Sequence, residues 1–255
     1  MTAASSVVFV HAHPDDEAIF TGGTIARLTG LGHRVTVVFL TNGDADPMGA
    51  VASERVAEAR AACELLGVAR VEFLGQGDSG LDAALAPPGS SWCADHQTLA
   101  DRVAAVLLDE RADALVLYDA GGIYGHPDHL VVHRIGHAAA VSAGTACVYE
   151  ATVDREYLHF VETHLVGHAV QSLLGMEIAA TNAAPLGVPT VEVTVTIDVR
   201  DVAAQKRAAM AAHASQIGPG SEALTMAADT FDGVYGYEWY VRAYGAAGPL
   251  EPLAF

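Results

Sequence analysis

The chain has 255 residues, 51% of them hydrophobic, and carries 13 basic against 31 acidic side chains, which gives a formal net charge of −18. A chain of this length can bury one large core, and we expect a single domain over residues 1–255. The negative charge disfavours binding to nucleic acids and to anionic membrane surfaces. No apolar run approaches the ~18 residues of a membrane span, so no membrane partner is expected.

The N-terminal residues and the cysteines bear on the cellular compartment. Residues 1–6 lack the basic and apolar regions of a secretory signal, which predicts a cytoplasmic protein. Cys63, Cys93 and Cys147 are widely spaced and form no CxxC pair, so we expect neither a disulfide framework nor a thiolate zinc site. A homo-oligomer is compatible with this composition.

Strand and helix signals alternate along the chain and predict an α/β fold with a mostly parallel sheet flanked by helices. The expected strands are 7–10, 34–41, 71–74, 114–118 and 146–151, and a later strand, 191–197, alternates apolar and polar residues and need not be parallel. The expected helices are 19–31, 53–66, 98–110, 127–143, 156–174 and a last one that includes 205–216, capped by Asp198 or Asp201. We expect a loop at 181–189 and a tyrosine-rich tail at 235–240.

The first expected strand stops at a cluster of polar side chains, residues 13–17, with the sequence His-Pro-Asp-Asp-Glu. Pro14 cannot continue a ladder, so the cluster should lie beyond the carboxyl end of the strand, where open α/β sheets bind ligands. Zinc accepts an imidazole such as His13 and a carboxylate such as Asp16, and Asp15 would remain as a spare base. The alternative is that both aspartates only cap the next helix, but capping does not require the histidine.

A second polar cluster, residues 119–129, leaves the expected strand 114–118. The carboxyl ends of parallel strands share one edge of a sheet, so the two clusters can converge. Pro127 in a first helical turn would place His129 just inside the helix. The next histidines on this helix, His133 and His137, have a spacing that can bind metal. Because they lie further from the loop and among apolar residues, we interpret them as packed or surface histidines.

Two glycine-containing segments bear on ligand binding. Gly22 and Gly23 do not form the GxGxxG fingerprint of dinucleotide-binding proteins, so we interpret them as packing positions. Residues 75–81 open a long irregular segment that is either a plain surface loop or a cover over the site.

The two clusters together resemble the motifs of the PIG-L/LmbE-like family of zinc-dependent N-deacetylases, and supporting matches cover most of the chain. The motifs are His-Pro-Asp-Asp-Glu at 13–17 and His-Pro-Asp-His at 126–129. The resemblance implies an LmbE-like, Rossmann-like fold and a zinc ion bound by His13, Asp16 and His129.

The resemblance also implies roles for the other side chains of the site. Asp15 falls on the general base, His126 on a residue that polarises or stabilises the reacting carbonyl oxygen, and Tyr124 on a mobile tyrosine. Asp78 belongs to a segment that resembles a sugar-contacting loop, and Arg55 lies where a substrate-binding arginine is found. Residues 206–216 are similar to a helix characteristic of the mycothiol deacetylase and mycothiol-conjugate amidase branch.

The predicted chemistry is amide hydrolysis. Three protein ligands leave zinc an open position for water, and a nearby carboxylate can take the proton of that water. Ferrous iron or another divalent ion also suits these ligands. Together with this chemistry, the family resemblance implies a hydrolase that removes the N-acetyl group from an N-acetylglucosamine-containing small molecule or glycoconjugate. The departing amine could receive its proton from Asp15 or from His126. The alternatives are an amidase for a thiol-sugar conjugate and a metal- or sugar-binding module without turnover.

Overall fold

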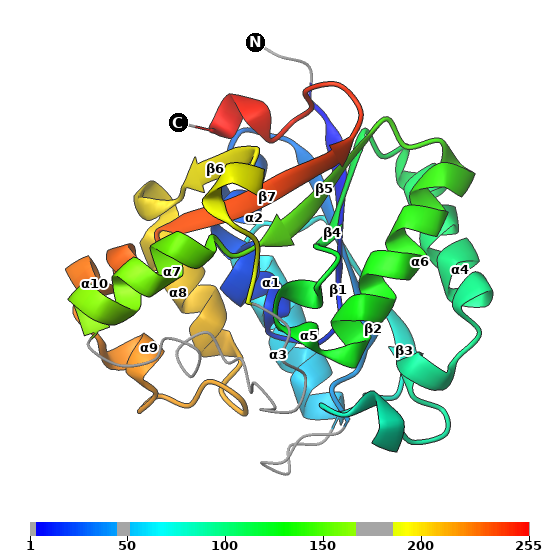
Figure 1. The fold of residues 1–255 in the computed structure, drawn as a ribbon, viewed down its shortest axis with the longest axis horizontal. Coiled ribbons are helices and arrows are strands. Elements are labelled where there is room, and N and C mark those ends of the chain that lie inside the picture. Colours follow the sequence, from blue (N-terminus) through cyan, green and yellow to red (C-terminus); the bar gives the residue numbers. More distant parts are fainter. Residues whose placement is uncertain (1–3, 45–51, 167–185, 255) are drawn as a thin grey trace.

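One twisted sheet forms the centre of the computed structural model (Figure 1), which describes residues 4–44, 52–166 and 186–254. In these ranges seven strands pair in the order β3-β2-β1-β4-β5-β7-β6. They are β1 (Ser6–His11), β2 (Arg34–Thr41), β3 (Arg70–Gln76), β4 (Ala114–Tyr118), β5 (Cys147–Thr152), β6 (Val195–Asp198) and β7 (Tyr237–Tyr244). Strands β1 to β5 are parallel, whereas β7 runs antiparallel to both β5 and β6. The predicted α/β class is confirmed, including a late strand that is not parallel.

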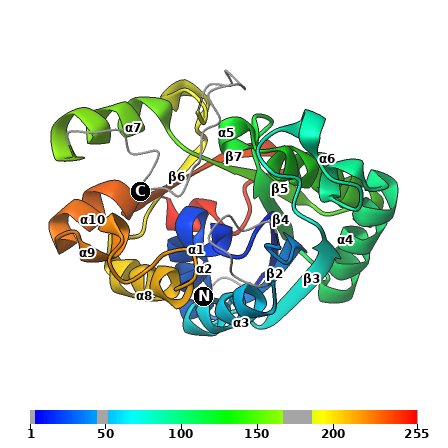
Figure 2. The ribbon, with the colours of Figure 1, turned by 90° about the horizontal axis from the view of Figure 1, so that it is seen from below.

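Helices cover both faces of the sheet (Figure 2). One face carries α4 (His96–Glu110) and α6 (Pro127–Ala143), and the other carries α2 (Gly22–Gly30), α3 (Ala52–Leu65) and α8 (Ala203–Ala212). Shorter helices are α1 (Asp16–Phe20), α5 (Gly122–Gly125), α7 (Arg155–Val161), α9 (Glu222–Thr225) and α10 (Ala228–Tyr235). Within the described ranges, none of the helices has the length and apolarity needed to cross a bilayer.

The neighbouring strands β1 and β4 create the place where ligands can bind. Every residue of β4 is buried, as are all but the first of β1, as expected for parallel strands covered on both faces. The chain leaves β1 toward β2 on one side and leaves β4 toward β5 on the other. The connections therefore diverge at the carboxyl ends of β1 and β4, which is where open α/β sheets bind ligands.

The expected helix 19–31 is wrong in one respect, because the chain forms two helices, α1 and α2, that meet at Thr21. Thr21 has φ −137° and ψ 4°, outside the helical region. Its hydroxyl donates to the Glu17 carbonyl at 3.1 Å and lies 3.0 Å from His11 Nε2. The predicted packing role of Gly23 is confirmed, since a Cβ there would lie 2.4 Å from Val199.

Three late elements differ from the expected ones. The strand expected at 191–197 is shortened to β6, because a 3₁₀ turn, Thr190–Glu192, follows Pro189. Helix α8 ends at Ala212 instead of continuing to 216, and its N-cap is Val202, which provides no side-chain hydrogen bond. Asp198 instead accepts a hydrogen bond from the Arg200 amide, at the turn that precedes the helix.

The tyrosine-rich tail is the strand β7, which inserts between β5 and β6. Its buried Glu238 interrupts the apolar pattern, so the sequence did not predict a strand here. Helix α7 ends at Val161 and continues as a π-helical segment, Glu162–Val166. The rest of the helix expected at 156–174, and most of the loop expected at 181–189, lie outside the described residues.

Candidate active site

The two polar clusters meet at the carboxyl ends of β1 and β4. His13 and Asp16 follow β1, and His129 lies in the first turn of α6, which follows β4. One side-chain ligand atom from each residue lies within 4.8 Å of the others. All three side chains are buried, His129 completely. The convergence that the sequence predicted is therefore present in the structure.

The spacing of these three groups suits a tetrahedral divalent ion. Asp16 Oδ2 lies 3.4 Å from His13 Nδ1 and 3.4 Å from His129 Nε2. Ligand atoms about 2.0 to 2.2 Å from a tetrahedral zinc ion are about 3.3 to 3.6 Å apart. Both nitrogens of His129 are buried and have no hydrogen-bond partner in the described part of the chain. An imidazole so placed lacks a partner that a bound cation would supply, so the donor set fits a metal.

Tyr118, the last residue of β4, holds the carboxylate of this cluster in place. Its hydroxyl donates to Asp16 Oδ2 at 2.8 Å, and its ring stacks on His129 with 4.2 Å between centroids. The same hydroxyl lies 3.0 Å from Nδ1 of His11, which is buried below the site. Burial lowers the pKa of His11 to about 4, so that its imidazole is neutral near pH 7.

Asp128 orients His13, a role that we did not predict although the residue belongs to the second motif. Its Oδ2 lies 3.0 Å from His13 Nε2 and accepts from the Ser79 amide, and its Oδ1 accepts from the Ser91 hydroxyl. A carboxylate bound to one imidazole nitrogen directs the other nitrogen toward a metal. Both serines lie in the irregular segment that follows β3, so this segment reaches the site. Burial lowers the pKa of His13, but Asp78, Asp128 and Asp16 outweigh this effect and raise it well above its usual value, which shows that the site favours positive charge.

Asp15 has an unusual backbone conformation, with φ 123° and ψ −30°. Such values are strained for a residue with a Cβ. The Asp15 amide donates to Glu17 Oε2 at 3.0 Å, and Glu17 Oε1 accepts from His213 Nε2 at 2.6 Å. Glu17 and His213 are both fully buried. The sequence did not reveal this pair. His213, at the end of α8, fixes Glu17 across 196 residues of sequence, and Glu17 in turn holds the strained turn at Asp15.

The half-buried Asp15 carboxylate lies between groups with opposite effects on its pKa. Burial raises the pKa of Asp15 to about 6, while the guanidinium of Arg55 opposes the shift. Arg55 is buried and donates to Asp15 Oδ2 at 3.3 Å, to the Pro14 carbonyl at 2.8 Å and to the Gly43 carbonyl at 3.2 Å. A group with a pKa near neutral can both accept and return a proton.

The other predicted residues also reach the site. Asp78 Oδ2 lies 3.4 Å from His13 Nε2. The Tyr124 ring packs edge-on against His129, with 4.9 Å between centroids, and against His126, with 5.9 Å. Burial raises the pKa of Tyr124 well above 10, so the side chain remains a phenol.

His126 is the N-cap of α6 and is buried. Its Nδ1 accepts a hydrogen bond from the Asp128 amide at 3.1 Å, so in the neutral ring the proton is on Nε2. Burial lowers the pKa of His126 well below 6.5, and the neighbouring His13 lowers it further. His126 is therefore a neutral donor, which differs from the imidazolium that would stabilise an oxyanion by charge.

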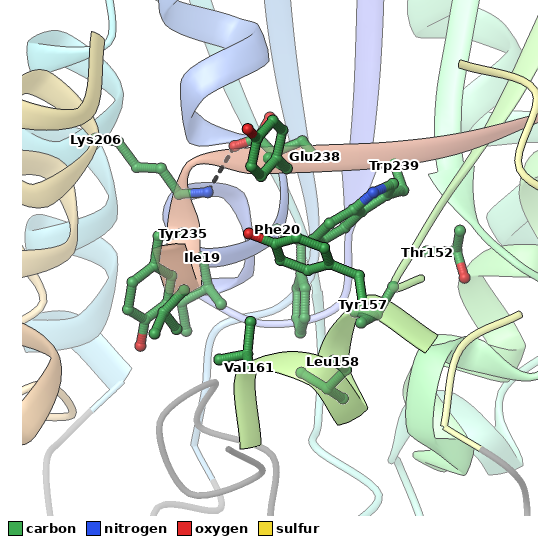
Figure 3. A pocket seen from close by; sticks show the side chains of 13 residues that line it. Ile19, Phe20, Thr152, Tyr157, Leu158, Val161, Lys206, Tyr235, Glu238 and Trp239 are labelled. Carbon is green, nitrogen blue, oxygen red and sulfur yellow. Dashed lines mark hydrogen bonds and ion pairs between the residues drawn. The ribbon is translucent and has the colours of Figure 1, made fainter. Parts of the chain in front are cut away.

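Phe20 is one of the side chains that line an apolar pocket (Figure 3). The Phe20 ring meets the His129 ring edge-on, with 6.3 Å between centroids. Aromatic and aliphatic side chains from α1, α7 and β7 line most of the pocket, and the ion pair between Lys206 and Glu238 borders it. Through Phe20, the cluster of His13, Asp16 and His129 thus borders an apolar wall.

Comparison with known proteins gives the family. The PIG-L family model, described as "GlcNAc-PI de-N-acetylase", matches residues 8–140, which include both motifs. The 1D-myo-inositol 2-acetamido-2-deoxy-alpha-D-glucopyranoside deacetylase of Salinispora arenicola is 34% identical over 270 residues, covering 95% of this chain and 86% of that protein.

Two solved structures are similar in fold. The N,N'-diacetylchitobiose deacetylase of Pyrococcus horikoshii has a TM-score of 0.57 at 20% identity and covers 94% of this chain and 84% of its own. The 4-carboxy-2-hydroxymuconate hydratase GalB of Pseudomonas putida has a TM-score of 0.62 at 18% identity and covers 96% and 98%. Since a deacetylase and a hydratase share this fold, the fold alone does not define the reaction. The reaction is defined by the family match and by the 34% identity over 95% of the chain. The chain belongs to the PIG-L family of de-N-acetylases and is a deacetylase hydrolase.

Proposed function

We propose that the chain removes the acetyl group from 1D-myo-inositol 2-acetamido-2-deoxy-α-D-glucopyranoside, using a zinc ion held by His13, Asp16 and His129. The 34% identity to a curated relative with this named activity, over 95% of the chain, carries the choice of substrate. The relative's name supports a deacetylase in preference to the amidase considered from the sequence. The half-buried carboxylate of Asp15 beside the three ligands supports turnover in preference to binding alone.

The ion would supply Lewis acidity, which makes water nucleophilic near neutral pH and polarises the amide carbonyl. Asp15 accepts the proton of the attacking water, since its pKa of about 6 leaves it ionised at pH 7. Arg55 donates to its carboxylate and Glu17 accepts from its backbone amide, and both contacts keep Asp15 in place for this step. The new C–O bond forms at the amide carbon, and the C–N bond then breaks to give acetate and the sugar amine.

His126 acts as a neutral hydrogen-bond donor in this mechanism. Its Nε2–H donates to the oxygen that becomes negative as water attacks, a role typical of an oxyanion hole. A neutral imidazole is a poor source of a proton for the amine. Asp15, protonated by the water, is the stronger acid of the two, so we assign protonation of the leaving amine to Asp15. Tyr124 lies on the same side of the ligand cluster and can donate from its phenol.

The substrate's sugar would contact the polar rim of the site. Asp78 is half-buried at 3.4 Å from His13, where its carboxylate can accept hydrogen bonds from sugar hydroxyls. Arg55 has a buried Nε without a partner among the described residues, although its terminal nitrogens hold the loop around Pro14. We propose that both residues position the sugar, Arg55 partly through the loop that it anchors.

A substrate panel tests the proposal. Metal-loaded protein should release free amine from the pseudodisaccharide faster than from free N-acetylglucosamine, N,N'-diacetylchitobiose and a thiol-sugar amide conjugate. Removing metal with a chelator should abolish release, and adding zinc back should restore it. Equal rates on all four compounds would refute the substrate assignment, and preferential cleavage of the conjugate would favour the amidase.

Variants separate metal binding from proton transfer. Alanine at His13, Asp16 or His129 should lower metal content together with activity. Asp15→Asn should keep its metal and lose about 100- to 10,000-fold in kcat, the usual contribution of a general base. Metal analysis and kcat measured on the same samples decide this, and a metal-replete Asp15→Asn protein with normal turnover would exclude Asp15 as the base.

A further inference from the structure

Two histidines further along α6 face a carboxylate on the adjacent strand. His133 and His137 lie one and two turns beyond His129, and Glu150 lies on β5. Glu150 Oε1 lies 2.7 Å from His137 Nε2 and 3.5 Å from His133 Nδ1. One ligand atom from each of the three residues lies within 4.8 Å of the others. The sequence alone left these histidines as packed or surface residues, because it could not place Glu150 beside them.

The main chain already orients one of these imidazoles. His133 Nδ1 lies 3.0 Å from the Tyr118 carbonyl, and because a carbonyl only accepts, this nitrogen carries a proton. In the neutral ring the lone pair is then on Nε2, so Nε2 is the atom of His133 that would bind an ion, and the 3.5 Å from Nδ1 to Glu150 only records how near the two side chains are. A backbone carbonyl bound to one nitrogen is a frequent partner of a metal-ligating histidine, because it fixes the tautomer and the ring. The two histidines are on one face of a rigid helix, four residues apart.

The charge of the group also favours a cation. Glu150 has a side chain only 13% exposed, and in the described ranges no lysine or arginine lies within ion-pair distance of it. A largely buried carboxylate requires a counter-charge. Either a protonated histidine or a bound divalent ion can supply it. The imidazoles remain 22% and 28% exposed, so water can complete the coordination of an ion.

We propose that His133, His137 and Glu150 form a second metal site, which binds a divalent transition ion such as Zn²⁺, Ni²⁺ or Co²⁺. Imidazole and carboxylate ligands suit these ions, and an i, i+4 histidine pair with one carboxylate is a ligand set used for zinc. A bound ion would link α6 to β5. The proposal does not depend on the reaction at the first site, since His13, Asp16 and the general base are not part of this group.

Metal stoichiometry tests the second site. Protein equilibrated with zinc at stepwise increasing free concentrations should bind a first equivalent and then a second. His137→Gln and Glu150→Gln should each lose the second equivalent and keep the first, with deacetylation unchanged. His159→Gln, a control at an exposed histidine of α7, should bind both. The double variant His13→Ala/His137→Gln should bind less zinc than either single variant.

A thermal shift gives a readout that does not depend on turnover. In the His13→Ala background, Ni²⁺ should raise the Tm, because an ion bound only to the folded state stabilises it. Adding His137→Gln should abolish this rise, while the Tm in chelator stays the same and shows that the fold is intact. Undiminished zinc binding in both His137→Gln and Glu150→Gln, or a single equivalent in the wild type at saturating zinc, would overturn the proposal in favour of a protonated histidine as the counter-charge.

Discussion

The two ring nitrogens of His126 have different surroundings. Nδ1 accepts from the Asp128 amide and caps α6, so in the neutral ring Nε2 carries the proton. The first interaction stabilises the helix, and in the proposed mechanism the second nitrogen donates to the reacting oxygen. A substitution that removes the whole side chain therefore mixes an effect on folding with an effect on turnover.

We predict that His126→Asn separates these effects. Asparagine is among the best N-cap residues, so stability should change little, whereas alanine at this position should cost about 1 kcal/mol. Both variants lack the Nε2 donor, and we expect each to lose about 100- to 1,000-fold in kcat with metal retained. Urea unfolding, metal analysis and kcat measured on both variants check this. A His126→Asn enzyme that keeps normal kcat would show that the imidazole is not an oxyanion donor.

The sequence predicted that the two motifs would converge. The structure does bring together His13, Asp15 and Asp16 from the first motif and His126 and His129 from the second, at the carboxyl ends of β1 and β4. The sequence did not reveal the residues that hold the site residues in place once the chain has folded. Glu17 belongs to the first motif and His213 to a late helix, and their 2.6 Å contact exists only after the chain between them has folded. No local pattern signals such a pair.

At the scale of elements, Glu238 on β7 joins three segments that are distant in sequence. Its carboxylate accepts from the amides of Gly23 and Thr24, each at 2.8 Å, at the start of α2. It also forms a 2.7 Å ion pair with Lys206 of α8. The N-terminus of a helix favours a negative charge, so α2 stabilises the Glu238 carboxylate. The buried Lys206 supplies the counter-charge. This ion pair connects the antiparallel end of the sheet to the helices beside the site.

We predict that Lys206→Met destabilises the protein by about 3 kcal/mol, because it leaves a buried carboxylate without its cation. The double variant Lys206→Met/Glu238→Gln removes both charges and should recover part of this loss. Urea unfolding of the two variants and of the wild type measures both values. If Lys206→Met changes the free energy of unfolding by less than about 0.5 kcal/mol, the size of an ordinary surface substitution, the ion pair does not stabilise the fold.

The same contacts explain which elements could be predicted. Strands β1, β2 and β4 are continuous apolar runs, and local sequence identifies them. Strand β7 contains a charged residue whose burial depends on Lys206, so its pattern does not indicate a core strand. The break between α1 and α2 likewise depends on tertiary contacts of Thr21. Local patterns therefore predicted the parallel half of the sheet and failed where distant residues decide the structure.

At the scale of the whole molecule, acid should unfold the protein in part through His11. Burial lowers its pKa from 6.5 to about 4, so the folded state resists a proton that the unfolded chain accepts. The stabilisation is complete above about pH 6.5 and is lost as the pH falls toward 4, by about 3 kcal/mol in total.

We predict that His11→Gln lacks this part of the acid sensitivity. Its amide can still bind the hydroxyls of Tyr118 and Thr21, but it does not titrate. The free energy of unfolding of metal-free wild type should fall more steeply between pH 6.5 and 4 than that of metal-free His11→Gln. Measuring both proteins without metal keeps metal binding out of the comparison, and the difference in slope is the expected signature of His11. Parallel curves would exclude the predicted pKa shift.

The strained turn at Asp15 implies a conflict between stability and activity at one position. Its φ of 123° costs about 1 to 3 kcal/mol for a residue with a side chain, but little for glycine. Selection for stability alone would therefore favour glycine at position 15, whereas the proposed mechanism needs a carboxylate there. Glu17, His213 and Arg55 compensate for the strain during folding, before any substrate arrives. If a relative lost the need for the reaction, this is where we would expect its sequence to change early, and the buried Glu17–His213 pair would then be free to diverge as well.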